Sequence, residues 1–333
     1  MVFDIRIAGT DVHFSCAPDQ NVLDAALRAG IEMPYSCRKG VCGNCAAAVP
    51  AGTLHSPPAE ARPPGQHLLC QCTPQSDLEI APEAWHRIDP AARKTFTAKV
   101  YRNALAADDV SLLQLRLPAG QRARFKAGQY LQVLLPDGSR RSYSMANPPH
   151  ESDTLQLHVR HVPGGQFTGI AAGLAAGDTL RVELPFGSFE LREEADAPML
   201  CVVGGTGFAP VKSLLDDMLK KGIRRPVTLV WGARDRAGLY LPAAVARWQK
   251  LLPGFRFIPA LQDADDARAM DGAFAGRVDD AVRTAFPSLA GHEVYCCGSP
   301  PMVAAVRQVC VQERGLEAHD FFSDAFVPGP AVR

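Results

Sequence analysis

The chain has 333 residues, of which 47% are hydrophobic and 21% charged, and its formal net charge is zero at pH 7. This length favours two or three domains, and the neutral charge argues against a nucleic-acid partner. No run of about 18 apolar residues is present, so we expect no membrane span. The N-terminus lacks a basic stretch followed by an apolar run, which predicts no signal peptide and a cytoplasmic protein.

The first domain, predicted over residues 1–89, has the pattern of a small α+β unit. Two alternating segments are typical of a β-hairpin, and the helical spacing that follows ends at Gly30. The expected elements are strands at 3–9 and 11–17, a helix at 19–30, a cysteine-rich loop, strands at 67–72 and 76–81, and a linker at 82–95.

The second domain, predicted over residues 94–194, consists of strand-like runs separated by turn residues. Evenly spaced strands of this kind indicate an antiparallel barrel, here interrupted by one short helix at about 167–177. The expected strand regions are 96–105, 110–120, 127–139, 141–149, 155–165 and 178–191.

The third domain, predicted over residues 197–333, alternates strand and helix patterns, which indicates a βαβ series with a parallel sheet. The segments that carry this alternation are 199–222, 226–235, 241–252, 255–262, 276–286 and 293–312.

Six of the ten cysteines lie between Cys16 and Cys72, which indicates metal chemistry rather than disulfides in a cytoplasmic chain. Cys37, Cys42 and Cys45 have the spacing C-x4-C-x2-C of plant-type [2Fe–2S] ferredoxins. The glycines of this loop would let the backbone wrap closely and aim N–H groups at the sulfurs. A zinc site more often shows two tight cysteine pairs, whereas this loop has one, so zinc is the alternative.

Cys70 and Cys72 are both candidates for a fourth ligand. On a strand both side chains would point to the same face, so direction does not choose between them. Residues 1–82 resemble the ferredoxin domains of bacterial oxygenase reductases, where the last ligand is the cysteine of an LxCQ pattern. This resemblance implies Cys70 as the ligand, Cys72 as a packed thiol near the cluster and Cys16 as a core residue.

The motif RSYS offers the groups that a flavin needs. Arg141 is a cation for a pyrophosphate, Tyr143 an aromatic ring for stacking, and Ser144 a small donor for the reactive N5. Its companion HVRHVPGGQFT combines a strand, a glycine turn and the start of a helix that carries Thr168. A helix N-terminus is a ready phosphate site.

The two motifs together resemble the ferredoxin–NADP reductase superfamily, whose RxYS and GGxxS/T elements bind FAD. The alternative is an ordinary barrel strand and a surface turn. The residues that this resemblance implies for FAD binding are Arg141, Ser142, Tyr143, Ser144, His158, Val159, Val162, Gly164, Gly165, Gln166, Phe167 and Thr168.

The segment LCVVGGTGFAPVKSLL is a strand, a glycine turn and a helix, and a pyrophosphate would lie at the helix start. Gly204, Gly205 and Gly207 allow a tight turn, and Pro210 suits the first helical turn. The Rossmann GxGxxG pattern is absent. The form GGTGxAP is that of the same reductase superfamily, which implies that this loop, with Thr206, binds nicotinamide nucleotide.

A second nicotinamide element is the pair Cys297–Gly298, at a strand end before another helix. In the superfamily this CG element lies against the nicotinamide, which would leave Cys296 to pack in the sheet. A lone CG pair would usually indicate a buried cysteine in a strand. Here it belongs to a set of three motifs in the order of the superfamily, which favours the nicotinamide role.

The aromatic residues near the end of the chain have two readings. In ferredoxin-containing reductases a terminal aromatic often covers the flavin face, and Phe326 matches that place, with Asp324 as a polar neighbour. An apolar strand that closes the sheet fits Phe321 and Phe322 better. For Phe326 both readings stay open.

The nucleotide preference depends on the residues after the second strand of the third domain. An acidic residue there favours the NADH ribose, and an arginine accommodates the 2′-phosphate of NADPH. Arg234, Asp235 and Arg236 point both ways, so the cofactor is written NAD(P)H, with Arg234 as a candidate phosphate ligand.

The order of ferredoxin, FAD barrel and nicotinamide domain explains how electrons from a nicotinamide could reach an iron–sulfur cluster. Nicotinamide gives two electrons as hydride, a [2Fe–2S] cluster takes one at a time, and FAD between them can hold one or two. Hydride would pass from nicotinamide C4 to flavin N5 beside the catalytic candidates Ser144 and Cys297, without a general base. Electrons would leave through the cysteine loop, where Arg38 and Lys39 are either solvated charges or a docking surface for an acidic patch.

This order resembles the reductase components of bacterial ring-hydroxylating dioxygenases and diiron monooxygenases. The segments IDPAARKTFTAKVY, RSYSMANPPHESD, HVRHVPGG and GGTGFAPVKSLLDD are similar to reductases of terephthalate 1,2-dioxygenase systems. The resemblance implies a β-grasp ferredoxin domain, a Greek-key FAD barrel and a Rossmann-like nicotinamide domain. It also implies a Rieske-type terminal oxygenase as partner and an aromatic dicarboxylate as the substrate of the complex.

Other partners and classes remain open at this point. The acceptor could be a diiron monooxygenase, a cytochrome P450 or a CDP-sugar deoxygenating dehydratase. A redox sensor that does not turn over nicotinamide is a further alternative. We expect a monomer.

Overall fold

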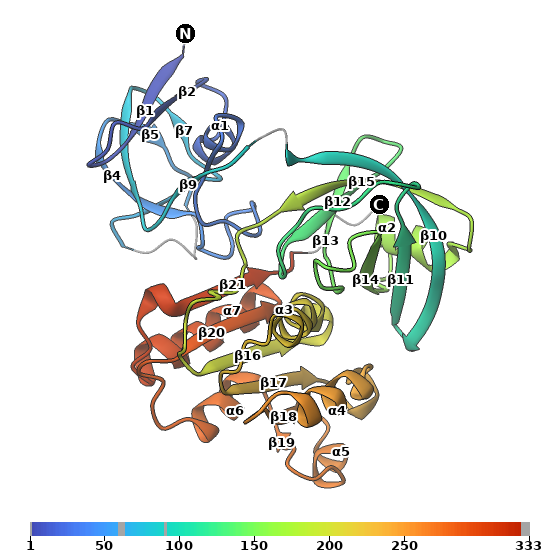
Figure 1. Ribbon diagram of the computed structural model, residues 1–333. Helices are drawn as coiled ribbons and strands as arrows, with labels where there is room; N and C mark the ends of the chain where they lie inside the picture. Colours follow the sequence, from blue (N-terminus) through green and yellow to red (C-terminus); the bar gives the residue numbers. More distant parts are fainter. Residues whose placement is uncertain (1, 59–63, 90–91, 328–333) are drawn as a thin grey trace. The chain divides into compact units, whose positions relative to one another are not determined.

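The computed structural model describes residues 2–58, 64–89 and 92–327 (Figure 1). The chain divides into two compact units, Met1–Arg93 and Lys94–Arg333. None of the described helices is both long and apolar enough to cross a membrane.

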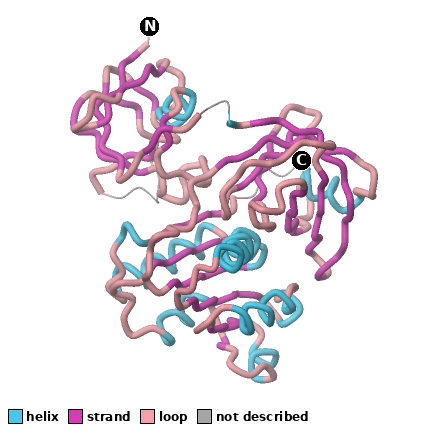
Figure 2. The backbone as a smooth tube through the Cα atoms, viewed as in Figure 1, coloured by secondary structure: helices cyan, strands magenta, loops and turns pink. Residues whose placement is uncertain are grey.

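The first unit has a five-stranded sheet in the order β2-β1-β8-β4-β6. Figure 2 shows the strands in magenta and the helices in cyan. Its strands are β1 (Phe3–Ile7), β2 (His13–Cys16), β4 (Ala46–Ala51), β6 (His67–Leu68) and β8 (Leu78–Pro82). The hairpin β1–β2 is antiparallel, and β8 returns parallel to β1. Helix α1 (Val22–Arg28) begins at Asn21, whose side-chain oxygen accepts a hydrogen bond from the Asp24 amide. This sheet, with α1 as the one α-helix among the described residues of the unit, is the β-grasp arrangement that the resemblance implies.

Two small sheets complete this unit. They are β3 (Ile31–Glu32) with β9 (His86–Arg87), and β5 (Leu54–His55) with β7 (Thr73–Pro74). The segment predicted as a linker therefore contributes a short strand, β9, before the next unit begins.

The predicted strand at 67–72 is wrong beyond Leu68, because residues 69–72 form a turn. The Gln71 amide donates to the Leu68 carbonyl at 2.8 Å. The carbonyls of Leu69 and Cys72 accept from amides in the first turn of α1, at 3.1 and 3.0 Å. These carbonyls satisfy a helix terminus instead of a sheet ladder. The argument that both cysteines share one face of a strand therefore does not apply.

The second unit begins with a six-stranded antiparallel sheet in the order β13-β12-β15-β10-β11-β14. Its strands are β10 (Lys94–Ala107), β11 (Val110–Arg116), β12 (Tyr130–Leu134), β13 (Arg140–Ser144), β14 (Thr154–Arg160) and β15 (Thr179–Phe186). A bridge between Met145 and Leu157 joins the two ends of the sheet and closes the barrel. Along β10 the buried Phe96, Ala98 and Val100 alternate with exposed residues. Helix α2 (Gln166–Gly173) interrupts the strands, as predicted.

The rest of the second unit is a parallel sheet in the order β19-β18-β17-β16-β20-β21. Its strands are β16 (Met199–Gly204), β17 (Val227–Ala233), β18 (Arg256–Leu261), β19 (Phe274–Ala275), β20 (Glu293–Gly298) and β21 (Phe321–Ala325). Its helices are α3 (Phe208–Lys221), α4 (Pro242–Leu251), α5 (Ala264–Arg268), α6 (Val278–Ala285) and α7 (Pro300–Arg307). Figure 1 shows α3 with α4 and α6 with α7 on the two faces.

The strand order reverses between β16 and β20, which makes a topological switch point. In such sheets ligands bind outside the carboxyl ends of the strands at that point. The glycine loop after β16 and Gly298 at the end of β20 therefore lie where a ligand is expected. Phe321 and Phe322 lie in the edge strand β21, as the strand reading predicts.

A shared core joins the barrel to the parallel-sheet module. Val110, Ala127 and Phe189 from the barrel side belong to the same buried cluster as Phe208 and Trp231. The two modules therefore form one compact unit. The domain boundaries given above, 1–89, 94–194 and 197–333, remain predictions.

Candidate functional site

The four predicted cluster ligands converge as two pairs of thiols. The Cys42 thiol donates to Cys37, which lowers the pKa of Cys37, and the Cys45 thiol donates to Cys70, which lowers the pKa of Cys70. The two pairs also interact electrostatically, Cys37 with Cys70 and Cys42 with Cys45. Among the described residues, no group of three or more histidine, cysteine or acidic side chains is arranged to hold one metal ion. Two pairs of cysteine side chains, once deprotonated, are a donor set that suits two irons.

The backbone of the loop turns its N–H groups toward these sulfurs. The Lys39 amide donates to Cys37 Sγ at 3.3 Å, and the Gly40 amide to Cys70. Gly40 and Gly43 have φ values of +74° and +80°, a region that favours glycine. The structure thus gives the loop the wrapped backbone that the sequence predicts, and this donor set fits a [2Fe–2S] cluster.

Cys72 lies apart from the two pairs. Its Sγ donates to the Leu68 carbonyl at 3.1 Å and contacts Ser56 Oγ at 3.5 Å, and the residue is fully buried. Cys16 is also fully buried, and burial raises the pKa of its thiol to about 11. The structure therefore brings Cys70, and not Cys72, to the loop. Cys70 remains a proposed ligand with this support.

The two cations of the loop have different surroundings. Arg38 has a positive φ of 55° and forms an ion pair with Asp24 on α1. Lys39 is exposed, and the neighbouring Val41 exposes 38% of its surface. Arg38 thus fixes the loop to the helix, whereas Lys39 and Val41 form its outer rim.

Arg141 lies at the N-terminus of α2. Its Nη2 donates to the side-chain oxygen of Gln166, the first residue of that helix, and Gln166 donates to Asp137. A Cβ at Gly165 would lie 2.4 Å from Thr168 Oγ1, so only glycine fits this turn. A guanidinium beside the unpaired amides of a helix start is a phosphate cradle. These residues fit the pyrophosphate of FAD.

The turn before α2 is tied together by one side chain. Thr168 Oγ1 accepts from the Val162 amide at 3.3 Å and lies 3.0 Å from the Val162 carbonyl. Gly164 reverses the chain there with φ of +70°. The Val162 side chain itself is 46% exposed.

Tyr143 and Phe167 pack with ring centroids 5.0 Å apart, and burial raises the pKa of the Tyr143 hydroxyl. Ser142, between Arg141 and Tyr143 on the same strand, is exposed. Ser144 is buried at the strand end, and its Oγ donates to Asp324 Oδ2 at 3.2 Å.

The side chains of His158 and Val159 are both buried. The Val159 side chain is buried in the barrel core. His158 Nδ1 lies 2.9 Å from the Tyr240 hydroxyl, and burial lowers the pKa of His158 to about 3. The other ring nitrogen of His158, Nε2, is buried without a hydrogen-bond partner.

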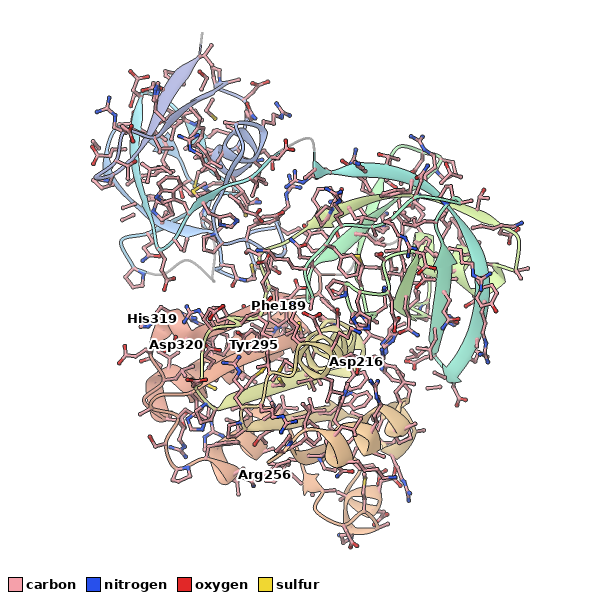
Figure 3. All side chains as sticks on the ribbon, in the orientation of Figure 1. Phe189, Asp216, Arg256, Tyr295, His319 and Asp320 are labelled. Atoms are coloured by element: carbon pink, nitrogen blue, oxygen red, sulfur yellow. The ribbon has the colours of Figure 1, made fainter. Side chains whose placement is uncertain are left out.

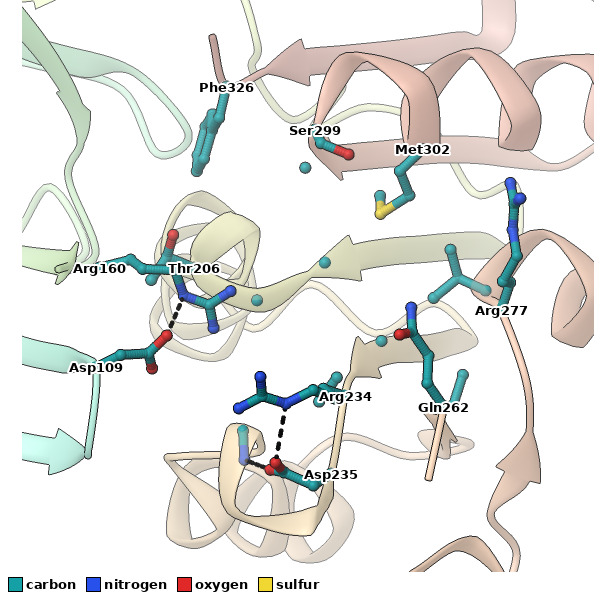
Figure 4. A pocket seen from close by; sticks show the side chains of 18 of the residues that line it. Asp109, Arg160, Thr206, Arg234, Asp235, Gln262, Arg277, Ser299, Met302 and Phe326 are labelled. Carbon is teal, nitrogen blue, oxygen red and sulfur yellow. Dashed lines mark hydrogen bonds and ion pairs between the residues drawn. The ribbon is translucent and has the colours of Figure 1, made fainter. Parts of the chain in front are cut away.

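A pocket of about 710 Å³ opens at the switch point of the parallel sheet (Figure 4). Five predicted nucleotide residues line it, namely Gly204, Gly205, Thr206, Arg234 and Gly298. Phe326, predicted to cover the flavin face, lines the same pocket. Gly207, Pro210 and Cys297 are buried and are not among its lining residues. A Cβ at Gly207 would lie 2.3 Å from the Cys297 carbonyl, so this glycine permits close packing of the loop on β20.

Four residues of the barrel line this pocket and were missed by the sequence motifs, namely Ala107, Asp108, Asp109 and Arg160. Arg160 Nε lies 3.2 Å from Asp109 Oδ2, and both side chains line the pocket (Figure 4). A Cβ at Gly205, whose φ is +53°, would lie 2.9 Å from the Arg160 guanidinium. The barrel therefore places a cation over the glycine loop where a pyrophosphate is expected.

Met302 was also missed. A Cβ at Gly204 would lie 2.5 Å from its Sδ, and a Cβ at Gly298 would lie 2.6 Å from its Cε. The two glycines at neighbouring strand ends thus make room for this side chain, which Figure 4 shows in the pocket wall. Paired glycines at adjacent strand ends are the signal that could have found it.

Cys297 is fully buried beside Asp324, its register partner on β21. Burial, with the nearby Asp324 charge, holds the pKa of its thiol well above the usual value, so the sulfur stays protonated. Cys296 is also fully buried in the sheet, as expected. The Phe326 amide donates to the Gly298 carbonyl at 2.8 Å, which holds the chain end beside the pocket.

The residues after β17 present two exposed arginines and one engaged carboxylate. The Arg234 side chain is 86% exposed, and its Nε lies 3.4 Å from Asp235 Oδ2. Asp235 Oδ1 accepts the Gly238 amide at 3.0 Å and so caps a turn. Arg236 is also exposed, and its backbone amide donates to Asp266.

Three family models match the chain in the order of its modules. A 2Fe-2S iron-sulfur cluster binding domain matches residues 5–75, an oxidoreductase FAD-binding domain residues 97–191, and an oxidoreductase NAD-binding domain residues 200–308.

Relatives match over the full length. Terephthalate 1,2-dioxygenase reductase component 2 of Comamonas sp. is 56% identical over 335 residues, with 99% of each chain covered. The CDP-6-deoxy-L-threo-D-glycero-4-hexulose-3-dehydrase reductase of Yersinia pseudotuberculosis is 34% identical, with 98% of this chain and 99% of that chain covered. The crystal structure of the Amycolatopsis cytochrome P450 reductase GcoB matches with a TM-score of 0.76 at 33% identity, over 98% and 99% of the two chains.

Proposed function

The chain belongs to the family of NAD(P)H-dependent [2Fe–2S] flavoprotein reductases that includes the reductase components of terephthalate 1,2-dioxygenase, and on this premise we propose that it supplies electrons to a Rieske-type oxygenase of that kind. The similarity at 56% identity, which covers 99% of this chain, supports this proposal most directly. The substrate of such a complex would be an aromatic dicarboxylate, bound by the oxygenase.

When bound, the nicotinamide supplies a hydride, FAD accepts electron pairs and releases single electrons, and the cluster carries one electron at a time. Arg141 and the first amides of α2 would hold the FAD pyrophosphate, and the Gly204–Gly207 loop with Arg160 would hold that of the nucleotide. Asp324 accepts the Ser144 hydroxyl and so orients it. Cys297 remains a protonated thiol that packs against the site, because its pKa is raised by burial. No side chain has to move a proton in this scheme.

The electron exit is the outer rim of the cysteine loop. Lys39 supplies an exposed cation there, and Val41 an exposed apolar side chain. Such a small apolar patch with a charge at its edge suits a transient interface with an acidic partner surface. The ion pair of Arg38 with Asp24 supports a role in holding the loop. The proposal therefore assigns docking to Lys39 and Val41 rather than to both cations.

Further parts of the proposal are a monomeric state and a cytoplasmic location. The ten cysteines, all free thiols, accord with a reducing compartment.

Reconstitution with purified acceptors tests the proposed partner. The protein is mixed with a terephthalate-type oxygenase, a cytochrome P450, a diiron monooxygenase or a sugar dehydratase, and NAD(P)H oxidation is followed. We expect oxidation coupled to formation of a diol from the aromatic dicarboxylate only with the first acceptor. Coupled turnover with another acceptor, and none with the oxygenase, would contradict the proposal.

Charge reversal tests the docking surface. Lys39→Glu is expected to lower electron transfer to the oxygenase by about tenfold at low salt, because steering is lost, while ferricyanide reduction stays within about twofold. Lys220→Glu, at an exposed site on α3, is the matched control. An equal loss of electron transfer to both acceptors would indicate that Lys39 is a solvated surface charge and not part of a docking surface.

A further inference from the structure

Two hydrogen bonds, one buried and one partly buried, join the segment after the flavin motif to the helix that follows the nucleotide loop. Ser213 Oγ donates to the Asn147 carbonyl at 2.7 Å, and Lys212 Nζ donates to the Ala146 carbonyl at 3.1 Å. Ser213 is fully buried, and Ala146 and Asn147 are at most 1% exposed. These acceptors follow Ser144 by only two and three residues, and both donors lie in the second turn of α3.

The barrel side of this junction is held by its own hydrogen bonds. Asn147 Nδ2 donates to the Glu151 and Thr154 carbonyls at 3.1 and 3.0 Å. Its Oδ1 accepts the Gln156 amide at 2.8 Å, and the Ala146 amide donates to the Gln156 carbonyl at 2.8 Å. The two acceptor carbonyls therefore have fixed positions on the barrel.

The helix side is held as well. Asp216, one turn after Lys212 on α3, accepts the Lys212 ammonium at 3.0 Å and Trp248 Nε1 at 2.9 Å. The carboxylate is only 6% exposed and also pairs with Arg247 at 3.2 Å. Figure 3 labels Asp216 on α3. Because Asp216 fixes the ammonium, Lys212 meets the Ala146 carbonyl in one geometry.

Two more buried polar contacts cross between the same modules. Ser144 Oγ donates to Asp324 on β21, and His158 Nδ1 lies 2.9 Å from the Tyr240 hydroxyl. All four side chains are at most 6% exposed. The strand ends that carry the flavin motif are thus fixed to the nucleotide module on several sides.

Hydride transfer needs such fixation. The reacting atoms must come within about 3–3.5 Å, and a misplacement of about 1 Å lowers the rate about 100-fold. Modules within one chain tend to move relative to each other unless their interface holds them. We propose that Lys212 and Ser213 are positioning residues, which set the distance between the flavin strand and the nicotinamide loop. This role rests on the hydride step of the family and does not depend on which oxygenase receives the electrons.

The first test measures hydride transfer in the holoprotein. In Ser213→Ala and Lys212→Met, flavin reduction by NAD(P)H in stopped-flow experiments is expected to slow by about 10- to 100-fold. The KM for NAD(P)H and the FAD content should stay within about twofold of wild type, since neither residue lines the nucleotide pocket. Lys212→Arg keeps a cationic donor and should recover much of the rate. Lys220→Met, at an exposed position of the same helix, is the control.

The second readout needs no bound cofactor. Hydrogen–deuterium exchange of residues 144–150 and of the start of α3 should be faster in both variants than in wild type and Lys220→Met. A flavin-reduction rate equal to wild type in Ser213→Ala and Lys212→Met would overturn the positioning role, whatever the exchange shows. A change in the KM for NAD(P)H without a slower flavin reduction would also overturn the positioning role. Failure to reduce any oxygenase would contradict the proposed function alone, because the hydride step is measured without the oxygenase.

Discussion

The buried ion pair between Arg225 and Glu293 offers a test of how the parallel sheet is stabilised. Arg225 Nη1 lies 2.8 Å from Glu293 Oε2, and the two side chains are 2% and 3% exposed. The same carboxylate accepts the Tyr295 hydroxyl at 3.2 Å, and Arg225 also donates to the Ala195 carbonyl at 3.2 Å. Removing the carboxylate in Glu293→Leu would leave the guanidinium buried without its charge partner.

Breaking a buried pair in this way destabilises a protein by about 3–5 kcal/mol. For a folded unit of about 150–250 residues, 1 kcal/mol shifts the melting temperature by about 2–4 °C. We therefore expect Glu293→Leu to melt about 6–20 °C below wild type. In the double variant Arg225→Met/Glu293→Leu no charge is stranded, so most of the loss should be recovered.

Thermal unfolding followed by circular dichroism measures these shifts. Arg268→Met, which removes an exposed ion pair with Asp265, is the control and should shift melting by less than about 4 °C. The KM for NAD(P)H should not change in Glu293→Leu, because Glu293 begins β20 and the pocket lies at the strand's other end. A wild-type melting temperature for Glu293→Leu would refute the stabilising role of the buried ion pair. A double variant that melts as low as Glu293→Leu would refute it as well.

Three further changes test the site. Cys70→Ser should abolish the visible spectrum of the cluster and leave ferricyanide reduction by the flavin intact, whereas Cys72→Ser should keep the cluster. Iron and sulfide analysis of the two variants measures the cluster content. The opposite pattern would make Cys72 the ligand and Cys70 the packed thiol. If the exposed Arg234 guanidinium binds the 2′-phosphate, as the sequence predicts, Arg234→Ala should raise the KM for NADPH about tenfold and that for NADH little. Equal effects on both nucleotides in steady-state assays would contradict that role. The pKa of His158 in the folded protein is about 3, below the ordinary value of about 6.5. The fold therefore favours neutral His158, and this contribution to stability is fully present above pH 6.5 and is lost as the pH falls toward 3. His158→Asn should flatten the dependence of melting temperature on pH in that window, and an unchanged slope would contradict the assignment.

The predicted fold class is confirmed because its signals are local. The alternation along β10 and the glycine turn between β16 and α3 report the period and ends of their own elements. The failure at residues 69–72 has a non-local cause. There the carbonyls of Leu69 and Cys72 bond to the amides of Leu23 and Val22, about fifty residues earlier in the chain. No local pattern carries that information.

The candidate site divides in the same way. Motif residues such as Arg141 and Gly205 could be found because their residue type and spacing express the chemistry. Arg160 sits in an ordinary alternating strand, and only the fold brings its guanidinium over the glycine loop. Met302 has the pattern of an ordinary helix residue, and its role depends on two glycines that end different strands. Such residues become visible only when distant segments are placed together.

The segment GGTGFAPVKS therefore serves two sites within ten residues. Gly204 and Gly205 line the nucleotide pocket, and the last two residues of the segment bond to carbonyls that follow the flavin motif. Since a helix is rigid over two turns, any shift of the loop is transmitted to the flavin strand. A substitution that preserves the four-residue glycine loop but removes the bonds of Lys212 and Ser213 should leave nucleotide binding intact and impair the transfer between the two sites. The functional motif thus extends past its glycines to Ser213.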